Sequence, residues 1–252
     1  MKYFYDTEFL EDGTTIRLIS IGIVSEDGRS YYAINRNFSW EYLHRPEFSF
    51  VREYVWHHIP RFGDTMALDI CDENVKRPDV IAQEVREFLL GPDGSKEIPH
   101  IELWADYPAY DHVVLCQLWG RMIDRPLGIP ARTNDIIQFA EMIGIAEDDL
   151  ENQDGYPIQL GGTRHHALYD ASHNHEVFQW LCLKAVRIIG SELPSQEARQ
   201  IVEVTDPATD DEYHRAGVYC GEPVHCTPPH PGALPGTPYA PQTGPEVGLA
   251  TP

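Results

Sequence analysis

Two acidic residues near the N-terminus are the first candidates for chemistry. Asp6 and Glu8 stand two residues apart where an apolar run ends. A strand turns alternate side chains to the same face, so both carboxylates would point the same way. Two acids at the end of a buried strand repel each other and lose hydration unless a cation lies between them. The pattern therefore indicates a divalent-cation site, with an exposed, solvated strand face as the alternative.

A third acid, Asp111, stands at the predicted start of a helix that follows a predicted strand. Ligands collect beyond such strand ends in open α/β sheets. The alternative is an acid that merely stabilises the positive end of the helix dipole. Asp106, five residues earlier, competes for the same role. We favour Asp111 because it leads directly into the apolar residues that would anchor the helix to the core.

A histidine and a fourth acid occur further along the chain, with two possible pairings. His166 and Asp170 are four residues apart and would share one face of a helix. His165 would point about 140° around the helix from Asp170 if both residues were helical. His165 fits a common site only if it lies on the loop before the helix. Gly161-Gly162 just upstream makes a mobile loop plausible, and a base on such a loop suits a reaction with a closing step.

The elements that must position these residues follow from hydrophobic patterning. Strands are expected at 2–6, 15–24, 30–35 and 100–105, and a weakly signalled one near 156–160. The turn Asp12-Gly13 would join the first two strands, and the first strand is apolar enough to be central.

Helices are expected between and after these strands. They span 49–58, 78–90, 110–122, a segment from a Thr133 or Asn134 cap to Ile143, and about 164–189. The order of elements predicts an α/β protein.

Composition changes after about residue 204. Residues 205–252 hold ten prolines and six glycines, and such a segment cannot bury enough apolar surface to offset its ordering entropy. We expect a folded domain over 1–195 and a largely disordered, Pro/Gly-rich tail over 196–252. Cys220 and Cys226 lie in the tail at spacings that do not match a zinc module.

The ordered motifs resemble a known family. Asp-x-Glu, then Tyr110-Asp111, then His-x4-Asp resembles the DEDDh branch of the DnaQ-like 3′–5′ exonucleases. The stretch from His165 to Ala171 is similar to that branch's His-x-Ala-Leu-x-Asp-Ala. The start Tyr-Phe-Tyr-Asp-Thr-Glu-Phe, the run Leu-Ile-Ser-Ile-Gly and the stretch Ala109–Gly120 are similar to small exoribonucleases of the ribonuclease AS type. The resemblance covers roughly residues 1–190.

The resemblance implies a fold and a mechanism. The fold would be ribonuclease-H-like, with a mixed five-stranded sheet flanked by helices. Asp6, Glu8 and Asp170 would hold one metal ion, and Asp6 would bridge to a second ion that Asp111 would reach through water. His165 would be the general base. All-oxygen ligation suits Mg²⁺, and Mn²⁺ should substitute.

The resemblance also implies a substrate. We expect hydrolysis of single-stranded RNA from the 3′ end, with release of nucleoside 5′-monophosphates and a preference for adenylate-rich ends. Single-stranded DNA is the nearest rival substrate, because no motif reveals a contact to the 2′-hydroxyl. A non-catalytic nucleic-acid-binding relative is a further alternative. Thr7 and Phe9 are candidate substrate contacts, since aromatic rings stack on single-stranded bases.

Charge and length set further expectations. The net charge of −21 argues against binding by simple phosphate attraction, although a site that holds divalent ions can grip a strand end without a basic groove. No apolar run reaches the length of about 18 residues that a membrane span needs. The N-terminus lacks the pattern of a signal peptide, so we expect a cytoplasmic protein. A homodimer is expected from the resemblance.

Overall fold

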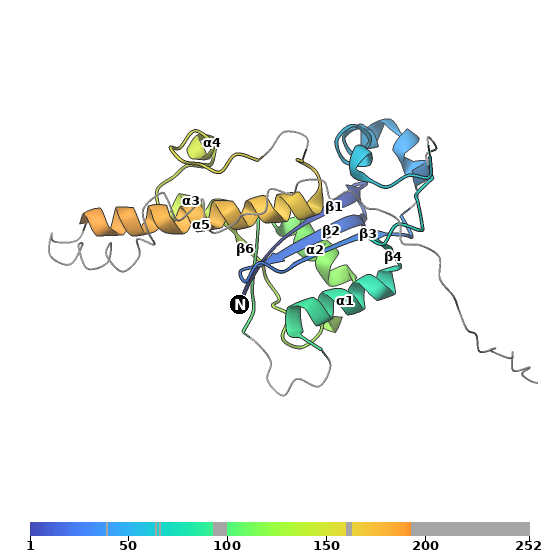
Figure 1. Cartoon of the computed structure of the whole chain (residues 1–252), viewed down its shortest axis with the longest axis horizontal. Helices are drawn as coiled ribbons and strands as arrows, with labels where there is room; N and C mark the ends of the chain where they lie inside the picture. The colour runs from blue at the N-terminus through green and yellow to red at the C-terminus, as the bar shows by residue number, and fades with distance from the viewer. Residues whose placement is uncertain (39, 64, 66, 93–99, 160–162, 193–252) are drawn as a thin grey trace, which may run out of the picture. The chain divides into compact units, whose positions relative to one another are not determined.

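A six-stranded mixed sheet forms the centre of the domain (Figure 1). The computed structural model describes residues 1–38, 40–63, 65, 67–92, 100–159 and 163–192. The strand order is β4-β3-β2-β1-β5-β6, in which β1, β2 and β3 are antiparallel and the pairs β1–β5, β3–β4 and β5–β6 are parallel. The strands are β1 (Lys2–Glu11), β2 (Ile16–Ser25), β3 (Ser30–Asn35), β4 (Val75–Lys76), β5 (Glu102–Ala105) and β6 (Asn134–Asp135).

The α/β class and the mixed sheet expected from the sequence are confirmed, with six strands in place of five. The first strand is central, as its apolar sequence predicts. The additional strands β4 and β6 are only two residues long, and the local sequence carries no signal for them. Residues 156–159 form no strand, so the weakly signalled strand there is wrong within the described residues.

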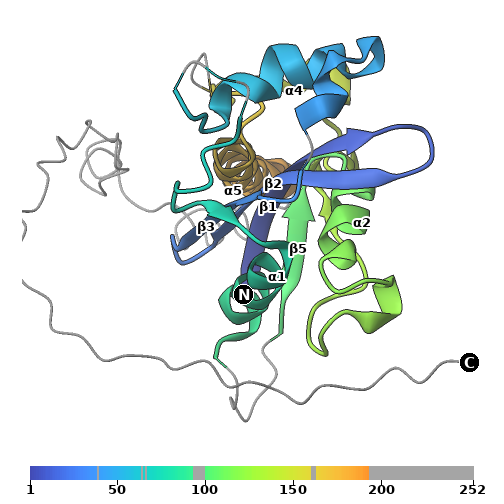
Figure 2. The same cartoon turned by 90° about the vertical axis from the view of Figure 1, so that its right-hand side faces the viewer.

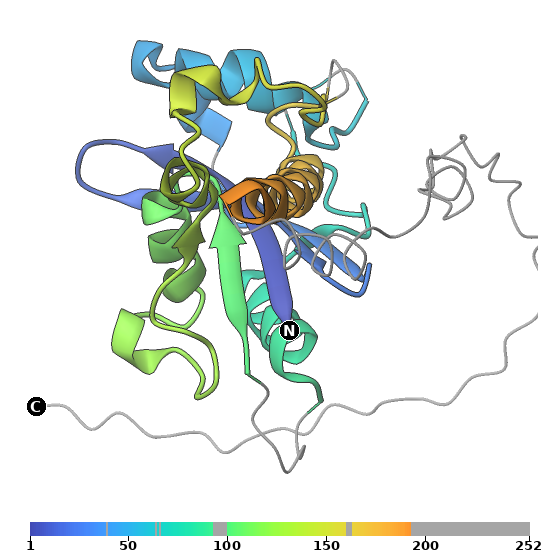
Figure 3. The same cartoon turned by 90° about the vertical axis from the view of Figure 1, so that its left-hand side faces the viewer.

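Helices cover both faces of the sheet (Figure 2). They are α1 (Pro78–Leu90), α2 (Ala109–Gln117), α3 (Ile136–Met142), α4 (Glu147–Leu150) and α5 (Ala167–Glu192). Side chains of α1 and α2 pack with Tyr3 and Tyr5 of β1. Side chains of α3 and α5 pack with Phe4. Figure 3 shows α5, in orange, lying over this face of the sheet. The alternation along β1 thus assigns its even-numbered residues to the face that α5 covers.

A third cluster of buried apolar side chains, separate from those around Tyr3 and Phe4, includes the segment after β3. The segment after β3 forms short helical turns at Trp40–His44, Pro46–Phe48, Val51–Val55 and Trp56–His58. Its apolar residues pack with Ile19 and Ile34 of the sheet. The helix predicted over 49–58 is therefore helical, but as a π-helical turn followed by a 3₁₀ turn. We call Phe50–His58 the capping segment.

Two helix boundaries differ from expectation because tertiary contacts compete with local preference. Helix α3 is capped by Asp135, whose carboxylate accepts from Ile137 N, and not by Thr133 or Asn134. Thr133 instead bonds to the Tyr5 hydroxyl at 2.6 Å, and Asn134 belongs to β6. Helix α2 ends at Gln117 rather than near 122, and a short 3₁₀ turn follows at Met122–Asp124.

Some expectations lie outside the described residues. These are the disordered tail over 196–252 with its cysteines, the domain boundary at 195, and the glycine pair at 161–162. Among the described helices, none combines the length and the apolar character needed to cross a bilayer.

Candidate active site

Strand β1 extends beyond its parallel neighbour, and this extension carries the first two acids. The β1–β5 pairing ends with Phe4 opposite Trp104, whereas β1 continues to Glu11. Asp6 and Glu8 lie in the extension on the face that carries Phe4, which is the face under α5. The side chain of Glu8 is only 8% exposed. The expectation that both acids share one face agrees with this arrangement.

A glycine allows α5 to start directly against these acids. Gly22 of β2 is the register partner of Asp6. A Cβ atom on Gly22 would lie 2.3 Å from both the Ala167 oxygen and the Leu168 nitrogen, so any side chain there would collide with the first turn of α5. The close approach brings the residues at the start of α5 to the carboxylates of β1. The sequence around Gly22 carries no local signal for this role, because the contact joins residues that are far apart in the chain.

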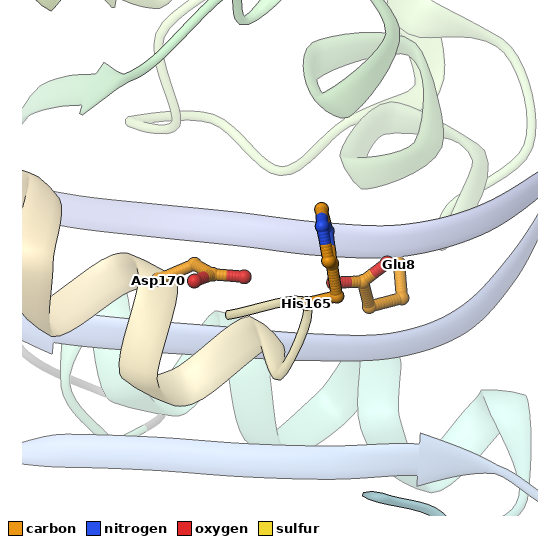
Figure 4. Close-up of side chains that lie close together, drawn as sticks. All are labelled: Glu8, His165 and Asp170. Carbon is orange, nitrogen blue, oxygen red and sulfur yellow. The ribbon is translucent and has the colours of Figure 1, made fainter. Parts of the chain in front are cut away.

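His165 and Asp170 meet Glu8 at this point. One ligand atom from each of the three side chains lies within 4.8 Å of the others. Figure 4 shows the carboxylates of Asp170 and Glu8 on either side of the His165 side chain. His165 precedes α5, and its φ of 63° places it in the left-handed region. This agrees with the condition that His165 lies before the helix.

His166, the other histidine that spacing allows, has a different environment. Its ring stacks on Tyr32 at 4.5 Å between centroids and packs edge-on against His58 at 5.3 Å. Burial, then the neighbouring His58, lowers the pKa of His166 to about 4. The ring is therefore neutral at physiological pH and sits in a packed aromatic cluster.

Asp111 reaches the site from the start of α2. Its Oδ1 accepts hydrogen bonds from the Thr7 backbone nitrogen at 2.9 Å and from the Thr7 hydroxyl at 2.6 Å. Strand β5 has ended before this point, so Asp111 satisfies a backbone donor that the sheet does not. Thr7 is 4% exposed, and its hydroxyl is committed to Asp111.

Burial raises the pKa values of the four acids, and neighbouring carboxylates raise those of Asp6 and Glu8 further. Burial, then the neighbouring carboxylates, holds the pKa of Asp6 well above its usual range. Burial, then Asp170 and Asp111, raises the pKa of Glu8 from 4.5 to about 8. Burial also raises the pKa values of Asp111 and Asp170. Each acid therefore resists ionisation unless positive charge is supplied nearby.

The donor set fits divalent cations of the magnesium type. Four crowded carboxylates offer hard oxygen ligands. No lysine or arginine forms an ion pair with Asp6, Glu8, Asp111 or Asp170 among the described residues. The four acids thus have no lysine or arginine partner in the described part of the chain, and bound cations would stabilise such a cluster.

A cavity of about 240 Å³ adjoins the acids, and its wall includes Asp6, Asp106, Gln159, Arg164, His165 and Asp170. Gln159 Nε2 donates to Asp170 Oδ1 at 2.5 Å. Burial, followed by repulsion from Asp135, raises the pKa of Asp106 to about 6. Asp106 thus lines the same cavity as Asp6 and Asp170. Of the two competing acids, Asp111 is the one that is hydrogen-bonded to Thr7.

Aromatic residues of the capping segment surround the catalytic candidate His165. Phe50 lies edge-on to the His165 ring at 4.9 Å, and Tyr54 lies at 5.6 Å. Both are largely exposed. The sequence does not indicate this role for Phe50 and Tyr54, because no spacing relates residues 50–54 to residue 165.

The candidate substrate contact Phe9 is partly buried beside Tyr110, with ring centroids 5.8 Å apart.

Comparisons with known proteins agree with the geometry. Residues 1–182 match the 3′–5′ exoribonuclease Rv2179c-like domain. Two similar proteins are the 3′–5′ exoribonucleases Rv2179c and MT2234.1 from Mycobacterium tuberculosis strains H37Rv and CDC 1551. Each is 43% identical over 141 residues, which cover 56% of this chain and 74% of the relative. The predicted DEDDh resemblance is confirmed: the chain belongs to the Rv2179c-like family of DEDDh-type 3′–5′ exoribonucleases.

Proposed function

We propose that this chain hydrolyses single-stranded RNA from its 3′ end and releases nucleoside 5′-monophosphates. The observation that carries the proposal is the convergence of Glu8, His165 and Asp170 within 4.8 Å, next to a cavity that Asp6 also lines. The order of these residues in the chain is that of the DEDDh motifs. The membership of an exoribonuclease family supports RNA as the substrate.

Two divalent cations, Mg²⁺ or Mn²⁺, would be held by the acids. Asp6, Glu8 and Asp170 would hold one ion, and Asp6 and Asp111 the other. When bound, the ions supply positive charge that makes the attacking water more acidic and stabilises the charge on the phosphate. Thr7 orients Asp111 by binding one oxygen, and the other oxygen of that carboxylate would be the one to take part in holding an ion.

His165 would act as general base. Its ring nitrogen lies beside two of the carboxylates, and an imidazole can accept a proton near neutral pH. Deprotonated water would attack the terminal phosphorus, and the bond from phosphorus to the 3′-oxygen of the preceding nucleotide would break. That oxygen would then take a proton from solvent.

The 3′ end of the substrate would lie across the exposed rings of Phe50 and Tyr54, which contact His165. Phe9 remains our candidate for stacking on the terminal base, and Thr7 would act through Asp111. The preference for adenylate-rich 3′ ends and the homodimer are proposals that rest on the family resemblance. Homopolymer competition assays test the first, and light scattering of the purified protein tests the second.

The experiment is a time course on matched RNA and DNA oligonucleotides with a 5′ label. We expect stepwise shortening of RNA in Mn²⁺ or Mg²⁺, release of nucleoside 5′-monophosphates, and no cleavage in chelator. Preferred shortening of DNA would reassign the substrate. Binding of RNA without cleavage in any divalent cation would favour the non-catalytic alternative.

A further inference from the structure

A histidine of the capping segment is bound to the peptide that precedes His165. His58 Nε2 lies 2.9 Å from the carbonyl oxygen of Arg164, although the two residues are 106 positions apart in the chain. A carbonyl can only accept, so the His58 Nε2–H group must donate. Burial lowers the pKa of His58, which favours the neutral ring. The hydrogen bond then requires that the proton of this ring is on Nε2.

This hydrogen bond acts on one backbone torsion angle, the φ angle of His165. The Arg164 carbonyl belongs to the same peptide plane as the His165 nitrogen. Rotation of that plane about the His165 N–Cα bond is the φ angle, which is 63° here. Residues other than glycine adopt such values only where the surroundings hold them. The bond from His58 therefore restrains the torsion that turns His165 toward Glu8 and Asp170.

The same ring also packs on the residue after His165. His58 lies edge-on to His166 at 5.3 Å, and His166 stacks in turn on Tyr32 of β3. Phe50 and Tyr54 of the same capping segment contact the His165 ring. The capping segment thus contacts the His165 ring directly, and it also contacts both neighbours of His165, through the Arg164 carbonyl oxygen and the His166 ring.

We infer that His58 is a positioning residue for the general base, and that its hydrogen bond to the Arg164 carbonyl keeps His165 aimed at the carboxylates. The inference rests on the proposed function of His165. His58 touches neither substrate nor the reacting atoms in this account. Its loss should therefore impair the chemical step and leave RNA binding and metal binding intact.

The test separates the hydrogen bond from the packing. His58→Phe retains an aromatic ring against His166 and removes the donor, whereas His58→Gln retains an N–H donor and removes the ring. We expect His58→Phe to lower kcat roughly 10- to 100-fold, as misplaced catalytic groups do, with KM unchanged. His58→Gln should keep most of the activity. His57→Ala is the control, because His57 is exposed in the same turn and lies 3.8 Å from the His58 ring.

A wild-type kcat in His58→Phe, or equal impairment of both variants, would overturn the inference. Unchanged Mn²⁺ affinity and melting temperature would confirm that the metal site and the fold are intact. Crystal structures of the two variants give a readout that does not depend on RNA. His165 should leave Glu8 and Asp170 in His58→Phe and stay in His58→Gln. A wild type that cleaves no RNA would instead defeat the proposed function, and the crystal structures would still decide the positioning role.

Discussion

Thr7 donates two hydrogen bonds to a single oxygen of Asp111, from its backbone nitrogen at 2.9 Å and from its hydroxyl at 2.6 Å. The pair joins the extension of β1 to the start of α2. Because one Asp111 oxygen is bound, the carboxylate has a fixed orientation, and its other oxygen is available to a cation.

Removal of the Thr7 hydroxyl should therefore weaken catalysis more than folding. Thr7→Val keeps the shape and the backbone bond but loses the shorter bond to Asp111. We expect a kcat reduction of roughly tenfold, as for loss of groups that orient metal ligands, and a stability loss of about 1 kcal/mol. Steady-state kinetics and urea unfolding measure both. Thr7→Ser, which retains the hydroxyl, should remain near wild type; equal loss in both variants would contradict the role.

A side chain at position 22 should separate α5 from the acids. The Cβ of Gly22→Ala would meet the Ala167 oxygen at 2.3 Å, and both contact atoms are backbone, so the start of α5 must move. Overpacking of this kind costs about 1–3 kcal/mol. We expect a lower melting temperature and at least tenfold slower RNA cleavage.

The matched control is Gly28→Asn. Gly28 has a positive φ of 85°, which asparagine tolerates, and its Cβ would meet nothing within 4 Å. That variant should cleave RNA at the wild-type rate. If Gly22→Ala retained full activity, the close approach of α5 would not be needed for the site.

The raised pKa of Glu8 predicts a pH-dependent effect of metal on stability. The folded protein keeps the Glu8 proton up to about pH 8, whereas the unfolded chain releases it near 4.5. The folded state therefore binds more protons in this window, and without metal its stability falls as pH rises from about 4.5 to 8. Bound cations favour the ionised carboxylate and should offset the loss.

Differential scanning calorimetry in chelator and in Mn²⁺ checks this prediction. The increase in melting temperature caused by Mn²⁺ should be larger at pH 8 than at pH 5.5. Glu8→Gln cannot ionise, so in chelator it should show a shallower decline with pH than wild type. An identical decline in the two proteins would mean that Glu8 does not carry the effect.

The two adjacent histidines should differ sharply in their effect on the rate. His165→Ala should lower kcat by at least 100-fold, because a general base contributes about 10²–10⁴-fold, and should leave Mn²⁺ affinity nearly unchanged. His166→Phe keeps a ring stacked on Tyr32 and should retain most of the activity. The reverse order of activities would assign the base to His166.

Local patterns predicted most of the framework. The helix over 78–90 and the strands expected at 15–24 and 30–35 appear at or near their expected limits, because turn residues and apolar periodicity define them. The first strand, expected over 2–6, continues to Glu11. The acids of β1 were found because a strand fixes which side chains share a face. The family resemblance, which joined distant motifs, favoured His165 over His166, whereas spacing alone favoured His166.

Contacts between distant segments could not be predicted in this way. The sequence near Glu8 does not show that β1 extends beyond its pairing with β5. The length of this extension depends on where β5 ends. The close approach of Gly22 to Ala167 and the bond from His58 to Arg164 likewise join segments more than 100 residues apart. Asp135 caps α3 in place of Asn134, because the Asn134 side chain instead donates to the Leu103 carbonyl oxygen of β5.

The central claim is that Asp6, Glu8, Asp111 and Asp170 together hold two divalent cations. Anomalous diffraction from crystals grown in Mn²⁺ tests it most directly. We expect two anomalous peaks about 3.5–4 Å apart among these carboxylates. Peaks located elsewhere, or no peak near Asp6 at saturating Mn²⁺, would contradict it.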